Sequence, residues 1–137
     1  MRVRGGTGRR DGFRSRYLGG RMSKNMAWYD DYNRFFEIFV SKGENADETS
    51  FYFTDDENEE EHMIGFIAKF EKPYWIGGCD VKDGCDFSTA DDLFHAKVFD
   101  GRSIYDRWEM IVFVNFGGID INDWMIDENN QLRIKPR

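Results

Sequence analysis

The nine residues MIGFIAKFE, at positions 63–71, restrict the possible folds of this chain more than any other segment. Apolar side chains fill the even positions from 64 to 70, whereas glycine and charged residues fill most of the odd positions from 65 to 71. A period of two is typical of a β-strand that buries one face. A strand-like run at 50–54 is joined to this segment by the acidic stretch 55–61, so we predict an antiparallel pair.

Shorter runs along the chain complete a predicted sheet. Pro73 interrupts the alternation, and residues 74–76 resume it as a short strand. Residues 111–116, IVFVNF, are almost continuously apolar, as in a central strand that is covered on both faces. The segments 124–126 and 131–135 flank a polar turn and are predicted to close the sheet as a last hairpin.

The first predicted helix covers residues 30–42. Its aromatic side chains recur at helical spacing, with aspartates in front and Gly43 behind. The same residues also suit a strand, because aromatic and β-branched side chains dominate them. We predict the helix because both of its end signals are present.

Two further helices are predicted in the second half of the chain. Residues 88–92 have the pattern of an N-terminal cap, and the helix would run on to position 97. Ser103 with Asp106 repeats that pattern and is predicted to begin a helix over 104–110. A hairpin over 97–104, turning at Asp100 and Gly101, is the competing interpretation.

Chain length and aromatic content set the overall class. A chain of 137 residues fits one domain, and its 13 Phe, 6 Tyr and 4 Trp supply enough large side chains for a core. We therefore predict a single α+β domain. It has a mainly antiparallel sheet of about five strands, with about two or three short helices packed on one face.

Charge divides the chain into a basic arm at 1–21 and an acidic domain at 22–137. The arm holds seven arginines against one aspartate, and the domain holds 12 basic against 25 acidic residues, which gives formal charges of +6 and −13. An Arg/Gly arm suggests contact with a nucleic-acid backbone. Alternatively, translation begins at Met22 or Met26 and the arm is an upstream misreading. The field of the domain repels nucleic acid and membrane surfaces and favours basic proteins.

The lack of a membrane span and of a secretory signal predicts the cellular compartment, and the compartment predicts the redox state of the cysteines. No run reaches the roughly 18 apolar residues of a membrane span, and the arginine-rich start lacks a secretory signal, so we expect a cytoplasmic protein. Cys79 and Cys85 are then expected as free thiols. A two-residue turn at Asp83-Gly84 would hold their sulfurs roughly 10 Å apart, too far for a disulfide. The spacing of acids and histidines matches neither a calcium nor a zinc site, so no metal or cofactor is expected.

Catalytic signals are weak. His62 borders the acidic stretch, where carboxylates would raise its proton affinity, but we interpret it as a solvated loop residue. His95 is expected to have a structural role at or near the surface. Nucleophile elbows, zincin motifs and phosphate loops are lacking, and adjacent carboxylate pairs are too frequent here to indicate a dyad. We therefore predict a protein that is not an enzyme.

The acidic stretch is the best candidate for function. Six acids in seven positions form a charged surface that suits a basic partner, although such a run also serves solubility alone. Aromatic residues would supply the apolar anchors of an interface. The predicted partner-binding residues are Asp55, Asp56, Glu57, Glu59, Glu60, Glu61, Trp75 and Trp108.

These features favour an inhibitor that neutralises a basic protein. In charge and size the chain is similar in kind to an immunity protein against a nuclease toxin. A nucleic-acid mimic that fills the groove of a DNA-binding protein is the first alternative. A small-molecule enzyme or ligand-binding domain, and nucleic-acid binding through the arm, are the others.

Overall fold

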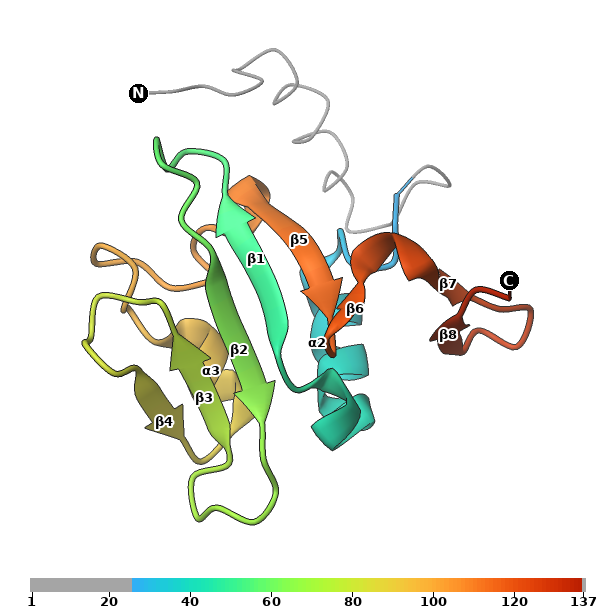
Figure 1. Ribbon diagram of the computed structural model, residues 1–137, viewed down its shortest axis with the longest axis horizontal. Coiled ribbons are helices and arrows are strands. Elements are labelled where there is room, and N and C mark those ends of the chain that lie inside the picture. The colour runs from blue at the N-terminus through green and yellow to red at the C-terminus, as the bar shows by residue number, and fades with distance from the viewer. Residues whose placement is uncertain (1–25, 137) are drawn as a thin grey trace.

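Residues 26–136 are described by the computed structural model, in which a six-stranded antiparallel sheet carries its helices on one face (Figure 1). The basic arm predicted at 1–21 lies outside the described residues. The order of strands in the sheet is β4-β3-β2-β1-β5-β6, and β7 and β8 form a separate two-stranded ribbon. The strands are β1 (Thr49–Phe53), β2 (His62–Phe66), β3 (Tyr74–Gly77), β4 (Cys85–Phe87), β5 (Ile111–Phe116), β6 (Ile119–Asp120), β7 (Trp124–Ile126) and β8 (Leu132–Ile134).

The α+β class is confirmed, but the predicted element counts are wrong. The sheet has six strands rather than about five, and α2 (Tyr32–Lys42) is the one main helix within residues 26–136. The second helix, α3 (Ala90–His95), has only six residues. Short 3-10 turns cover Gly43–Ala46, Trp108–Met110 and Ile121–Asp123.

The helix at 32–42 confirms the predicted helix over the alternative strand. Asp31 caps it by accepting a hydrogen bond from the backbone N–H of Arg34 at 3.0 Å. Gly43 ends it at φ +55°, a conformation that suits glycine. Phe35 and Phe39, one helical turn apart, are both buried against the sheet. The helix therefore forms because its end signals and its apolar spacing both favour a helix over the same residues.

The second half of the chain follows the alternative interpretation more closely. Thr89 caps α3 as predicted, but the helix ends at His95. Asp100 and Gly101 have φ of 58° and 82°, and Phe99 pairs with Arg102 across them, so a tight turn forms here.

The predicted helix at 104–110 is wrong. Ser103 and Asp106 exchange the expected capping bonds, each at 2.9 Å. The following backbone bonds run from Trp108 to Tyr105 and from Met110 to Arg107, three residues apart, so the segment is turns and a 3-10 helix. A capping box satisfies the first donors, but it does not fix the type of turn that follows.

Several strand predictions also need correction. The pairing of β1 with β2 is confirmed, but β2 ends at Phe66 because the N–H of Ile67 donates to the carbonyl of Pro73 and closes a turn. The β5 strand is covered on one face only, since Val114 is 39% exposed. The hairpin of β7 and β8 is a separate ribbon rather than the last part of the sheet.

The core lies between the helices and one face of the sheet. Phe35 of α2 stacks on Phe113 of β5 with ring centroids 4.4 Å apart, and Phe39 meets Phe94 of α3 at 5.4 Å. Strands β1, β2 and β3 add Phe51, Phe53, Ile64 and Ile76 to this core. Among residues 26–136, no helix has the length and apolar character needed to cross a membrane.

Candidate functional site

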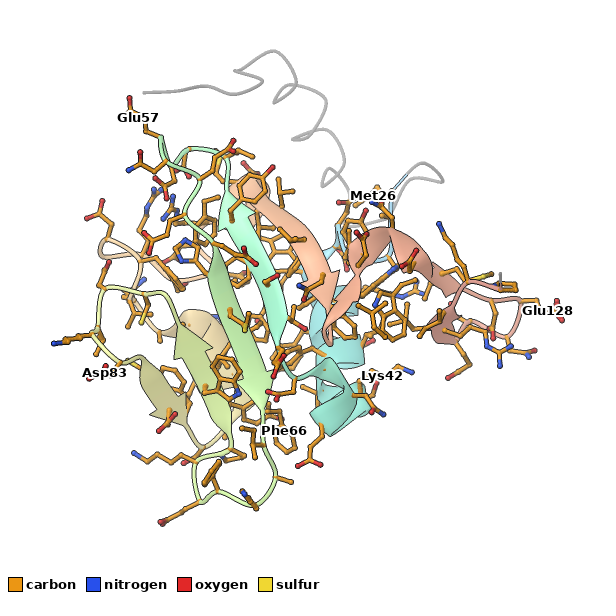
Figure 2. The ribbon with its side chains drawn as sticks, in the orientation of Figure 1. Met26, Lys42, Glu57, Phe66, Asp83 and Glu128 are labelled. Atoms are coloured by element: carbon orange, nitrogen blue, oxygen red, sulfur yellow. The ribbon has the colours of Figure 1, made fainter. Side chains whose placement is uncertain are left out.

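The acidic stretch lies at one end of the sheet and forms one wall of a cleft. Figure 2 shows Glu57 at the tip of the loop between β1 and β2, and Asp83 on the neighbouring loop 78–84. These loops and the Asp100-Gly101 turn enclose a cleft of about 310 Å³. Its lining residues are Asp55, Asp56, Glu57, Glu60, His62, Gly78, Cys79, Asp80, Phe99, Asp100, Arg102 and Arg107.

Asp56 organises the acidic loop. Its carboxylate accepts hydrogen bonds from the backbone N–H groups of Asn58, at 3.1 Å, and Glu60, at 3.2 Å. Its carbonyl accepts a third bond, at 3.1 Å, from the N–H of Glu59, which has a positive φ of 51°. Such aspartate-centred turns hold a polar loop in one conformation. Asp56 therefore shapes the loop as well as contributing charge to it.

Asp55 is neutralised within the fold. Its two carboxylate oxygens pair separately with Arg107 and with Arg102, the latter at 3.2 Å. Arg107 is only 8% exposed, and its guanidinium carbon lies 3.9 Å from the centre of the Phe53 ring. A buried guanidinium needs a carboxylate close by, because an unpaired charge in the interior is costly. Asp55, the first acid of the stretch, therefore stabilises the fold by pairing with the buried Arg107.

His62 is not the solvated loop residue that we predicted. It begins β2, is 6% exposed and packs among Phe51, Phe53 and Phe99. Its Nδ1–H donates to the carbonyl of Gly78 at 2.5 Å. That bond ties the start of β2 to the loop that forms the opposite wall of the cleft.

Four carboxylates of the cleft make no ion pair with any other residue in the described range. Glu57 and Glu60 come from the acidic loop, Asp80 from the loop 78–84, and Asp100 from the tight turn. Asp80 also accepts a hydrogen bond from the backbone N–H of Asp100 at 2.5 Å, which joins the last two segments. In total, six acids face two arginines, which leaves a formal excess of four negative charges.

The cleft does not provide the ligands of a metal site. Within residues 26–136, no three histidine, cysteine, aspartate or glutamate side chains are placed so that they could share a metal ion. The converging groups are carboxylates at the rim of a hollow, and their natural counterpart is a cationic group.

The structure brings together four of the eight predicted contact residues and separates the rest. Asp55, Asp56, Glu57 and Glu60 line the cleft, whereas Glu59 and Glu61 belong to the same loop without lining it. Trp75 lies elsewhere on the sheet, with its indole N–H donating to Asp47 at 2.8 Å. Trp108 is a buried core residue whose indole donates to the carbonyl of Asp30 at 2.9 Å.

The other residues of the cleft were missed in the sequence. Asp80 comes shortly after the glycine pair 77–78, and Asp100 is the first residue of the Asp-Gly turn, so that turn was the one available signal for this wall. Arg102 and Arg107 carry no motif, and only the fold shows that they meet Asp55.

Both cysteines are free, as predicted, but the reasoning about their register was wrong. Cys85 pairs with Ile76, so the connection between β3 and β4 is the loop 78–84 and not a two-residue turn. Cys79 lines the cleft. Burial raises the pKa of the Cys85 thiol, and the neighbouring Cys79 raises it further, in part by a hydrogen bond between the two side chains.

This pKa shift predicts slow alkylation of Cys85. The thiolate is the reactive form, so a thiol with a raised pKa reacts more slowly near neutral pH than a solvent-exposed one. We expect iodoacetamide to modify Cys85 more slowly than a cysteine in an unfolded peptide, measured by peptide mass spectrometry. The Cys79→Ala variant should react faster at Cys85, because the hydrogen bond and the neighbouring thiol that raise the pKa are both removed. A faster rate at Cys85 than in the peptide would contradict the pKa direction.

No family model, no curated protein and no solved structure matches this chain.

Proposed function

We propose that this chain is a non-catalytic binding protein that takes a cationic side chain of a basic protein partner into the acidic cleft and thereby neutralises that partner. One observation carries the proposal: four carboxylates without an ion pair to another described residue converge, from three segments, on one hollow. A nuclease toxin is a partner of this kind, and the chain would then act as its immunity protein.

The charge of the whole domain supports such a partner. Residues 26–136 hold 25 acidic and 10 basic side chains, a formal charge of −15. A field of one sign speeds the encounter with an oppositely charged partner and disfavours nucleic acid and anionic membranes. The net charge favours basic proteins as partners, and the acidic cleft offers a specific position where a cationic side chain of such a partner can bind.

The shape of the cleft favours a protein partner over the alternative of nucleic-acid mimicry. A mimic needs its negative charges in a row that follows the spacing of phosphates. Here the carboxylates surround a hollow of about 310 Å³, which suits one or two arginine or lysine side chains. Arginine is the better fit in chemical terms, because its guanidinium forms two parallel hydrogen bonds to one carboxylate.

The walls of the cleft are held in place before a partner arrives. Asp56 fixes the acidic loop, the His62 to Gly78 bond fixes the loop 78–84, and Asp80 binds the backbone of the tight turn. Less conformational entropy is lost on binding when the contact groups are already ordered. Pre-ordered walls therefore support a binding role for this end of the sheet.

The test uses the full chain and a short capped arginine peptide as the probe, with isothermal titration calorimetry. We expect binding that weakens steeply as salt is raised, because exposed ion pairs are screened. The double variant Glu57→Gln/Glu60→Gln should weaken binding about tenfold at low salt, since each exposed pair contributes up to about 1 kcal/mol.

The matched control is Glu37→Gln/Glu128→Gln, which removes the same charge away from the cleft. Glu37 is exposed on α2, and Figure 2 shows Glu128 in the ribbon loop, across the molecule from Glu57. The control should bind the peptide within about twofold of the wild type, since only long-range attraction is lost. Equal losses in the two double variants, or binding that salt does not weaken, would refute the proposal.

A further inference from the structure

The open face of the sheet carries a tryptophan that lies flat on a strand. Gly65 of β2, Trp75 of β3 and Asp86 of β4 are paired in one row across three strands, so their side chains share a face. A Cβ atom added to Gly65 would lie 2.5 Å from the Trp75 indole and would also collide with Asp47. The glycine therefore provides the space in which the indole rests.

The Trp75 indole is fixed in that position. Its Nε1–H donates to Oδ1 of Asp47 at 2.8 Å, and the same oxygen accepts the backbone N–H of Phe66 at 2.9 Å. Asp47 thus joins the tryptophan to the end of β2. The ring cannot turn without breaking this bond. It is half-buried, on the face of the sheet opposite to the helices described in residues 26–136.

Beside the indole lies a groove of about 400 Å³ that also contains a second aromatic ring. Phe70 belongs to the turn 67–73 and is 53% exposed, the highest value among the large apolar side chains described. Lys69 places its Nζ 5.4 Å from the centre of this ring, so Phe70 already attracts a cation of its own chain. Ile67 and Pro73 complete the apolar lining.

The turn that carries Phe70 is itself well held. The N–H of Ile67 donates to the carbonyl of Pro73 at 2.9 Å, and Glu44 accepts the N–H of Ala68 at 2.9 Å. Phe70 alone would be an ordinary exposed residue, but with Ile67, Pro73 and Trp75 it lines one contiguous groove, and contiguous apolar surface of this kind marks interaction sites.

Two carboxylates in the lining give the groove a preference for cationic groups. Asp86 is the cross-strand neighbour of Trp75, and Glu71 lies on the turn. Lys72 is the one lysine in the lining, and Lys69 lies over the Phe70 ring, where an incoming cation would take its place. The face of an aromatic ring attracts cations, and the two carboxylates add charge attraction. A neutral apolar group would dehydrate the carboxylates without pairing them, and an anion would be repelled.

From this arrangement we infer that the groove binds the side chain of a lysine, a methylated lysine or an arginine presented by a partner protein. The cationic head lies between the two rings and the two carboxylates, and the methylene stem packs on Ile67 and Pro73. The site does not depend on the acidic cleft, which lies at the other end of β2. Phe66 marks the groove end of that strand in Figure 2, and Glu57 lies near the cleft end.

The test follows the assigned indole N–H signal of Trp75 by NMR as capped amino acids are added to the full chain. Capped trimethyl-lysine and capped arginine should shift this signal and the amide signals of Phe70 and Asp86. Capped norleucine, which has a similar stem and no charge, should leave them in place. The variants Phe70→Leu and Asp86→Asn should each weaken the cation's binding about threefold, the scale of one exposed cation–π or ion-pair contact.

Two controls separate this inference from the proposed function. Tyr105→Leu removes an exposed aromatic ring away from the groove and should leave the titration unchanged. The cleft variant Glu57→Gln/Glu60→Gln should also leave it unchanged, even where it loses the arginine peptide. The inference is overturned if norleucine shifts Trp75 as strongly as the cations do. It is equally overturned if Phe70→Leu and Asp86→Asn have no effect.

Discussion

Replacing Asp55 with asparagine is expected to destabilise the fold by roughly 3–5 kcal/mol, as seen when one partner of a buried ion pair is removed. The carboxylate pairs with both Arg102 and Arg107, and Arg107 is buried over the ring of Phe53. Asparagine keeps the shape but leaves that guanidinium without a countercharge. Urea unfolding monitored by circular dichroism measures the loss as a lower transition midpoint.

A second acid of the same stretch provides the control. Glu57→Gln changes an exposed side chain with no described ion pair, so its effect should stay within about 0.5 kcal/mol. The double variant Asp55→Leu/Arg107→Met should regain much of the lost stability, because a buried pair replaced by apolar groups is often tolerated. Equal stability of Asp55→Asn and the wild type would show that Arg107 does not need its partner.

Shortening Phe35 to alanine is expected to cost the fold about 3–5 kcal/mol, the range for deleting a fully buried aromatic ring. Phe35 is completely buried and stacks on Phe113 at 4.4 Å, with Trp108 at 5.4 Å. The variant leaves a cavity where the helix α2 meets β5. Thermal and urea unfolding both report the change, and the helix content before unfolding should stay close to that of the wild type.

The neighbouring Phe36 is the matched control on the same helix. It is only half-buried, so Phe36→Ala should cost about 1–2 kcal/mol, in proportion to the area that it hides from water. Equal losses at the two positions would mean that α2 packs on the sheet through a different face.

Sequence patterns predicted the elements in which local and long-range signals agree. The helix 32–42 has a cap, a terminating glycine and a spaced apolar face, and the β1–β2 pair has a strand-like run on one side of a polar loop and an alternating run on the other. Where a local signal was ambiguous, the packing of residues far apart in the sequence determined the backbone conformation. The capping box at Ser103 led to a predicted helix, yet the chain there turns so that Ile104 and Trp108 enter the core.

The candidate site was predictable in charge but not in detail. Composition indicated the acidic loop, but nothing in it distinguishes Asp55 from Asp56 or Glu57. Asp55 differs because Arg107, 52 residues later in the chain, lies beneath it. The opposite wall depends on the length of the loop 78–84, and a strand register is poorly defined by sequence when the loop residues are equally polar.

The short β2 strand fixes the distance between the cleft and the aromatic groove. His62 lines the first, and Ile67, directly after the strand, lines the second, so about 17 Å of extended backbone separates them. A bivalent ligand that occupies both has to span a distance on the scale of this strand, which corresponds to about eleven residues of helix or about five of strand. The length of β2 would then select ligands by the spacing of their two charges. A ligand of matching length would bind more tightly through both sites than through either one alone.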